Sequence, residues 1–177
     1  MKISIEIFCA DAKGRGVTAS ATDVELTLAV TDPVNSDYEG AMTLSDLAKF
    51  KLIYVGSPYT LFPGGIAVAY IEICKLMAEL LRRGVNGYSP ICATHGIAKH
   101  GGIDPLDHTI WLPFDQAMMN KADALLIAQM KSWETSKGIG HEIDVFLAAG
   151  KPIYFLDPST LGIEPAPGLR AYARGAN

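Results

Sequence analysis

Four residues in the C-terminal part of the chain have types and spacing that could support chemistry: Ser136, Gly138, Gly140 and Glu142. A serine and two glycines at a helix start expose backbone N–H groups, which bind anions such as phosphate. Glu142 lies one turn into the expected helix and could simply complement the helix dipole. It could also be a nucleophile or base at a cleft. The strand at residues 153–156 favours the second interpretation, because ligands of α/β sheets bind at the carboxyl ends of strands.

A second carboxylate, Asp115, lies in an expected helix ahead of Asp123 and could face the same cleft as Glu142. It could equally be an exposed helix carboxylate, since periodicity alone does not exclude that position. Two carboxylates in one cleft would provide an acid/base and a nucleophile, as retaining glycosyl transfer requires. Trp111 and Trp133 flank these segments. A tryptophan more often belongs to the core, but in polar loops the two could form a wall for a flat base.

Gly56, Ser57 and Tyr59 follow an expected strand and lie at a ligand-facing edge of the sheet. An ordinary strand-to-helix turn also uses glycine and proline, so this segment alone is a weak signal. The chain contains neither the G-x-G-x-x-G pattern of dinucleotide-binding folds nor the phosphate-binding loop G-x-x-x-x-G-K-[ST]. Neither of these nucleotide-binding motifs is therefore expected.

Three histidines and two aspartates between residues 92 and 108 raise the question of a metal site. The spacing of His95, His100 and His108, with Asp104 and Asp107, matches no zinc pattern, and the chain has no H-E-x-x-H. We expect a solvated or substrate-lining loop there, and no metal.

The elements that would position these residues alternate between strand and helix from residue 51 onward. The pattern predicts strands at 52–55, 87–91, 124–130 and 153–156, and helices at 66–83, 111–121 and from the Ser136 turn to Gly150. This order predicts a three-layer α/β fold, Rossmann- or flavodoxin-like, with a parallel sheet and right-handed crossovers.

The first 49 residues look different from the rest. Alternating apolar residues at 3–7 and 24–30, separated by a turn around Gly14 and Gly16, predict an antiparallel β-hairpin. A short helix begun by Thr43 or Ser45 would follow. The expected organisation is thus a hairpin appendage with that helix (1–49), the α/β domain (50–158) and a C-terminal tail (159–177), with no regular pattern from Asp157 onward.

Length and composition suit a globular protein with one main domain. Of 177 residues 49% are apolar, and the net charge of −4 argues against a general nucleic-acid-binding surface. Cys9, Cys74 and Cys92 show no paired spacing, and Cys74 is expected to be a buried thiol. A reducing cytoplasm is the simplest compartment, with no signal peptide and no membrane-spanning segment expected.

On the residues described above, the main domain resembles the nucleoside 2-deoxyribosyltransferase superfamily, and more narrowly a branch of it found in bacteria and phages. The resemblance covers roughly residues 51–157. It rests on three segments whose order and spacing agree: Ile53-Tyr54-Val55-Gly56-Ser57-Pro58-Tyr59, then Asp115 ahead of Ala122-Asp123, and then Ser136-x-Gly138-x-Gly140-x-Glu142 ending in Gly150-Lys151-Pro152.

The resemblance implies roles for individual residues. In that superfamily the glutamate matching Glu142 attacks the anomeric carbon and displaces the base. The aspartate matching Asp115 assists proton transfer or holds the sugar, and the tyrosine matching Tyr54 orients the nucleophile. Together with the sequence patterns, the resemblance assigns substrate contacts to Gly56, Ser57, Tyr59, Trp133, Ser136, Gly138 and Gly140.

Ser136 indicates the subclass. Transferases of free nucleosides tend to carry an aspartate at this place, whereas the relatives that hydrolyse nucleoside 5′-monophosphates carry a serine that meets the phosphate. An aspartate would repel a phosphate, and a serine with accessible N–H groups would accept it. The motif is closest to the 2′-deoxynucleoside 5′-phosphate N-hydrolases. We therefore expect an N-glycoside hydrolase that cleaves the base–sugar bond of a nucleoside 5′-monophosphate through Glu142.

Other functions stay open at this point. The chain could exchange bases as a nucleoside 2-deoxyribosyltransferase. Because related α/β domains serve as nucleotide sensors in phage defence, it could also bind a nucleotide without cleaving it, or be a scaffold with a vestigial cleft. The resemblance implies no cofactor, a nucleoside or nucleotide as the small-molecule partner, no nucleic-acid polymer, and a homo-oligomer, dimeric or higher.

Overall fold

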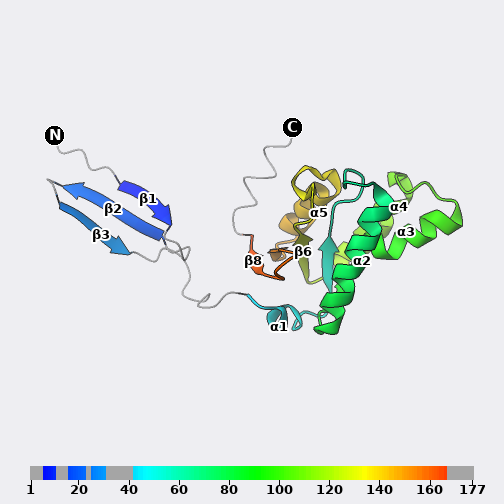
Figure 1. Ribbon diagram of the computed structural model, residues 1–177, viewed down its shortest axis with the longest axis horizontal. Coiled ribbons are helices and arrows are strands. Elements are labelled where there is room, and N and C mark those ends of the chain that lie inside the picture. The colour runs from blue at the N-terminus through cyan, green and yellow to red at the C-terminus, as the bar shows by residue number, and fades with distance from the viewer. Residues whose placement is uncertain (1–5, 11–15, 23–24, 31–41, 167–177) are drawn as a thin grey trace. The chain divides into compact units, whose positions relative to one another are not determined.

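The computed structural model of the chain describes residues 6–10, 16–22, 25–30 and 42–166 (Figure 1). The chain divides into two compact units, Met1–Gly40 and Ala41–Asn177. None of the described helices combines the length and the apolar character needed to cross a membrane.

The N-terminal unit is a three-stranded antiparallel sheet of β1 (Glu6–Ala10), β2 (Gly16–Thr22) and β3 (Glu25–Val30), in the order β1-β2-β3. It has one strand more than the predicted hairpin, because β2 lies between the two predicted strands and pairs with both. After Val17, β2 consists only of small residues, alanine, serine and threonine, so the alternation between apolar and polar side chains is weak there. Residues 1–5, Gly14 and Val24, which belonged to the prediction, lie outside the described residues.

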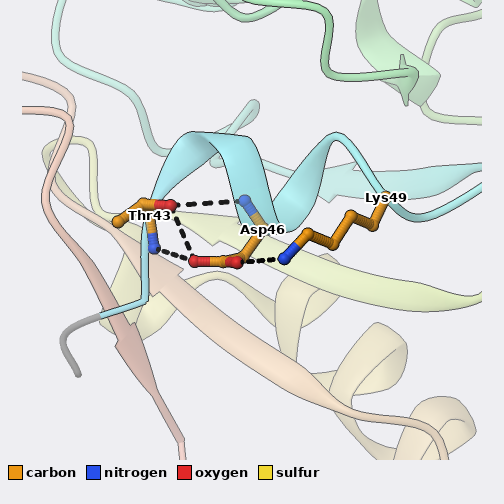
Figure 2. A network of polar contacts seen from close by, with 3 residues as sticks. All are labelled: Thr43, Asp46 and Lys49. Carbon is orange, nitrogen blue, oxygen red and sulfur yellow. Dashed lines mark hydrogen bonds and ion pairs between the residues drawn. The ribbon is translucent and has the colours of Figure 1, made fainter. Parts of the chain in front are cut away.

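The second unit begins with a short helix, α1 (Leu44–Leu47), and Figure 2 shows how it starts. The Thr43 hydroxyl accepts a hydrogen bond from the Asp46 backbone N–H, and the Asp46 carboxylate accepts one from the Thr43 backbone N–H at 3.0 Å. This reciprocal capping box satisfies two N–H groups that a helix start leaves unpaired. Lys49 adds an ion pair with Asp46 at 2.6 Å. Of the two predicted starts, Thr43 is therefore the cap.

The main sheet has five strands in the order β5-β4-β6-β7-β8. Four are parallel, namely β4 (Ile53–Gly56), β5 (Gly87–Tyr88), β6 (Ala124–Ala128) and β7 (Ile153–Leu156), and β8 (Ile163–Pro165) runs antiparallel to β7. The prediction that the tail lacks regular structure is wrong for β8. The Asp157 carboxylate accepts hydrogen bonds from Ser159 and Thr160, and this tight turn brings the chain back to β7.

Helices cover both faces of this sheet, which confirms the predicted three-layer α/β fold. The longer helices are α2 (Ile66–Arg82), α3 (Pro90–Gly101), α4 (His108–Lys121) and α5 (Lys137–Ala148), and a 3₁₀ turn, η1 (Trp133–Thr135), precedes α5 (Figure 1). One core cluster joins α1, α2 and α3 to Ile53, Val55 and Leu126, and the other joins α4 and α5 to Tyr54 and Leu125. Neighbouring strand residues thus face opposite layers.

The prediction of a polar loop after residue 91 is wrong, because α3 occupies most of that segment. The Ser89 side chain caps the helix by accepting from the Cys92 backbone N–H at 3.3 Å, and Pro90 takes the first helical position. Gly102 ends the helix with a φ of 70°. All three signals are present in the sequence, among histidines and glycines that favoured a loop.

Two further helix starts differ from the prediction. Asp107 caps α4, so this helix begins three residues early and Pro113 lies in its second turn, where the missing N–H removes a hydrogen bond. Helix α5 begins at Lys137, directly after its cap Ser136. Gly138, which the prediction placed in a glycine-lined turn just ahead of the helix, therefore lies within the first turn of α5.

Candidate active site

The strand order creates a crevice at the end of β4. The chain passes from β4 to β5 on one side of β4 and later to β6 on the other side. The carboxyl end of β4 is thus a topological switch point, where open α/β sheets bind ligands. A cleft of about 400 Å³ lies there between the loop after β4, α3, α4 and the start of α5. It brings together seven of the predicted site residues, which are Tyr54, Ser57, Tyr59, Asp115, Ser136, Gly138 and Glu142.

Glu142 lines this cleft, and its ionisable side chain is buried. It is 8% exposed, and its Oε2 atom has no hydrogen-bond partner among the described residues. Burial raises the pKa of the Glu142 carboxyl to about 8, and the negative charge of nearby Asp115 adds to the rise. The Tyr54 hydroxyl, buried in β4, hydrogen-bonds to this carboxyl and opposes the rise.

Asp115 reaches the cleft from α4. This helix presents a row of residues to the cleft at helical spacing: His108, Trp111, Leu112, Asp115 and Met119. The Oδ1 atom of Asp115 is buried and has no hydrogen-bond partner among the described residues. Burial raises the pKa of the Asp115 carboxyl to about 6. Helical periodicity alone could not determine which way this carboxylate points. The tertiary structure shows that it faces the cleft.

The two carboxyl groups form an acid and base pair. Their pKa values of about 6 and about 8 mean that the pair holds one proton between these two pH values. A pair in this state contains one proton donor and one ionised carboxylate, as acid/base and nucleophilic chemistry at a single carbon requires.

Gly56 is required by the position of the Glu142 carboxylate. A Cβ atom at residue 56 would overlap Glu142 Oε2, so only glycine lets the carboxylate approach the end of β4. Ser57, the next residue, is 7% exposed, and its buried Oγ has no hydrogen-bond partner among the described residues. Ser57 lines the cleft and has a donor and an acceptor for a ligand.

The start of α5 provides a second polar surface in the cleft. The Ser136 Oγ accepts a hydrogen bond from the Ile139 backbone N–H at 3.4 Å, which leaves its hydroxyl hydrogen as a donor. Ser136, Lys137 and Gly138 line the cleft. The positive end of the helix dipole and the Lys137 charge both favour an anion at this position. Gly140 is exposed and is not among the lining residues.

Besides Tyr54, the aromatic side chains of Tyr59 and Trp111 line the cleft, and this pair differs from the two tryptophans of the sequence interpretation. Trp111 lines the cleft and donates a hydrogen bond from Nε1 to the Asp104 carbonyl oxygen at 2.8 Å, which fixes its ring. Tyr59 lines it as well. Trp133 is not among the lining residues and packs against Phe155 at a ring-centroid distance of 5.2 Å.

The sequence analysis allowed the segment after residue 91 to line a substrate site, but it missed that a helix, α3, brings residues of this segment to the cleft. Its first turns supply Ile91 and Thr94 to the cleft. The ring of His95, which is 9% exposed, hydrogen-bonds through Nδ1 to the Tyr59 hydroxyl at 2.8 Å and so fixes the Tyr59 side chain. The helix-start signal of Ser89 and Pro90 could have located these residues.

Tyr88 in β5 lies beside the site without being among the residues that line the cleft, and no motif marked it. Its ring lies 5.6 Å from that of Tyr54, and its buried hydroxyl has no hydrogen-bond partner within the described part of the chain. Burial, with the charge of Asp115, raises the Tyr88 pKa to about 12. Across the described residues, no three His, Cys, Asp or Glu side chains gather in a way that could hold a metal ion.

Comparison with known proteins adds one finding. Residues 51–157 match the family model described as "Domain of unknown function (DUF1937)". No curated protein matches the chain. The matched segment begins just before β4 and ends just after β7, so it contains every residue of the cleft discussed above.

Proposed function

The chain belongs to the DUF1937 family, and we propose that this member is an N-glycoside hydrolase that cleaves the base–sugar bond of a nucleoside 5′-monophosphate. One observation carries the proposal. Glu142 and Asp115 both have raised pKa values and buried oxygen atoms without partners among the described residues, and both line one cleft. Two carboxyl groups in this state supply the nucleophile and the acid of a retaining glycosyl transfer.

The reaction has two steps. In the first, the ionised Glu142 carboxylate attacks C1′ from the face opposite the base. A C1′–O bond forms as the C1′–N bond breaks, and Asp115 gives its proton to the departing base. In the second, Asp115 takes a proton from a water molecule whose oxygen attacks C1′, and Glu142 leaves as a carboxylate. The products are the free base and a sugar 5′-phosphate.

The protonation state of the pair suits this sequence. At neutral pH the two groups share one proton, and moving it from Glu142 to Asp115 creates the nucleophile and the acid without changing the net charge. The Tyr54 hydroxyl stabilises the ionised Glu142 through its hydrogen bond and fixes the direction of attack.

The rest of the cleft supports a nucleotide as the substrate. A 5′-phosphate would accept hydrogen bonds from the Ser136 hydroxyl and from the first N–H groups of α5, with Lys137 nearby. The base would lie between the rings of Tyr59 and Trp111, which His95 and the Asp104 carbonyl hold in place.

Chromatography of free base tests the reaction. The full chain is incubated with a panel of nucleosides and their 5′-monophosphates, with and without an acceptor base. We expect base release from monophosphates without an acceptor, and loss of release in Glu142→Gln but not in Asp144→Asn, an exposed residue of the same helix. Release only with an acceptor would replace hydrolysis by transfer, and stoichiometric binding without release would make the domain a nucleotide binder.

A substitution at Ser136 tests the phosphate contact separately. Aspartate also caps helices well, so Ser136→Asp retains the start of α5 while placing a negative charge at the expected phosphate position. We expect kcat/KM for monophosphates to fall by about 10- to 100-fold, equal to roughly 1.4–2.7 kcal/mol, while activity on free nucleosides does not fall. Equal loss for both substrates would place the phosphate elsewhere.

A further inference from the structure

Two cysteines far apart in the sequence meet between neighbouring helices. Cys74 lies on α2 and Cys92 on α3, and their Sγ atoms are 3.4 Å apart. Both side chains are half-buried and both thiols are free. The sequence spacing had indicated no pairing, because the two residues are 18 positions apart. An S–S bond is about 2.05 Å long, so a closing movement of only about 1.4 Å separates these thiols from a disulfide.

A continuous set of contacts leads from this thiol pair to the cleft. The Tyr70 hydroxyl interacts electrostatically with the Cys74 thiol, which lies one turn further along α2. The Tyr70 ring stacks on the His95 ring at a centroid distance of 4.2 Å and an angle of 13°. His95 in turn holds the Tyr59 hydroxyl at 2.8 Å, and Tyr59 lines the cleft.

The backbone of α3 provides a second connection. The Cys92 N–H donates to the Ser89 side chain that caps α3, and the same first turns carry Ile91 and Thr94, which line the cleft. A movement of Cys92 toward α2 therefore acts on the part of α3 that forms the cleft wall. Packed helices transmit such shifts because their side chains leave little free space.

We propose that Cys74 and Cys92 are a redox-sensitive thiol pair that forms a reversible intramolecular disulfide between α2 and α3, and that its formation changes the Tyr59 side of the cleft. This pairing does not depend on the proposed hydrolysis. Disulfides of this kind in reducing compartments are transient and regulatory rather than structural.

A small-molecule disulfide such as oxidised glutathione serves as the oxidant. The Cys74 thiolate attacks one glutathione sulfur, which forms a mixed disulfide and releases one glutathione thiol. Cys92 then loses its proton and attacks the Cys74 sulfur, which forms the protein disulfide and releases the second thiol. Two protein thiols are oxidised and one glutathione disulfide is reduced to two thiols. Burial raises the pKa of the Cys92 thiol to about 12, which disfavours its thiolate as the first nucleophile.

Peptide mass spectrometry tests the pairing on the full chain. The folded protein is reduced, equilibrated with glutathione buffers of increasing oxidised fraction, alkylated in acid and digested with trypsin. Cleavage at lysine and arginine places Cys74 in residues 52–75, Cys92 in residues 84–99 and Cys9 in residues 3–13. We expect a disulfide joining the first two peptides, lighter by two hydrogen atoms and reversed by dithiothreitol, with Cys9 left out of it.

Two comparisons make the result decisive. The Cys74→Ser variant should form no intramolecular disulfide, so that Cys92 is not linked to another peptide of the same chain. The Cys9→Ser variant is the control, and it should still form the disulfide. Alkylation of both Cys74 and Cys92 at oxidant levels that convert Cys9 to a mixed disulfide would overturn the pairing. A bond between two chains would overturn it as well.

Hydrogen exchange of the oxidised and reduced wild-type chains tests the effect on the cleft. We expect amides of α3 and of residues 57–62 to change their exchange rates several-fold, with the C-terminal half of α5 unchanged as an internal control. Identical exchange of α3 and of residues 57–62 in the two forms would overturn the transmission to the cleft.

Discussion

Replacing Glu142 by glutamine should make the protein more stable at high pH, because the native carboxyl is held in an unfavourable environment. Burial raises the Glu142 pKa from its ordinary value of 4.5 to about 8. Between these values the unfolded chain ionises this group while the folded chain keeps its proton. The unfolded state then binds fewer protons, so the wild-type stability falls as pH rises from 4.5 to 8.

The size of this loss follows from the two pKa values. A difference of about 3.5 pH units, at about 1.4 kcal/mol for each, gives a loss of up to about 5 kcal/mol. Glutamine does not ionise, so the Glu142→Gln variant escapes this loss. Relative to wild type, the variant should gain up to about 5 kcal/mol between pH 4.5 and pH 9. Any constant effect of the new amide on packing cancels in this comparison.

Urea unfolding followed by tryptophan fluorescence from pH 4.5 to pH 9 measures the effect. The control is Asp144→Asn, at an exposed position of the same helix, which should follow the wild-type pH dependence. The variant that gains stability should lose all base release, since the same burial that weakens the fold prepares the carboxyl for chemistry. A constant stability difference between wild type and Glu142→Gln across this pH range would refute the reasoning.

The same cleft yields three further predictions. Gly56→Ala places a methyl group against the Glu142 carboxylate, so it should lower the free energy of unfolding by about 1–3 kcal/mol and remove most of the activity. In Gly96→Ala the added Cβ meets nothing within 4 Å, so this control should keep both its stability and its activity. Urea unfolding and base-release assays measure the two effects. The rate of base release should follow a bell-shaped pH profile with limbs near 6 and 8, because the reaction needs one proton shared by Asp115 and Glu142. Removing the Tyr54 hydroxyl with phenylalanine should move the upper limb to higher pH, and a profile unaffected by this change would contradict the role of that hydrogen bond.

The sequence contains enough local information to predict most of the main domain. Strand β4 and helix α2 correspond to apolar runs that end at a glycine, namely residues 52–55 and the helix before Gly84. Such elements form from interactions between neighbours in the chain, and the predicted bounds agree with the structure within a few residues. The failures have local causes too. The small residues of β2 gave a weak hydrophobic signal, and the Ser89 cap of α3 lay beside residues that favour a loop. Strand β8 depends on pairing with β7, which no local pattern reveals.

The residue types of the candidate site were determined by the sequence, which singled out Glu142 and Asp115 from their spacing. Whether Asp115 faces a cleft or solvent was decided only by the packing of α4, because a helical period does not say which face is covered. Burial, and not sequence position, raises both pKa values, since desolvation depends on every element around the group. The same holds for the two tryptophans, of which Trp111 lines the cleft while Trp133 packs against Phe155, and for the contact between Cys74 and Cys92. Residues far apart in the chain meet only when helices pack on a sheet, and that packing is a property of the whole fold.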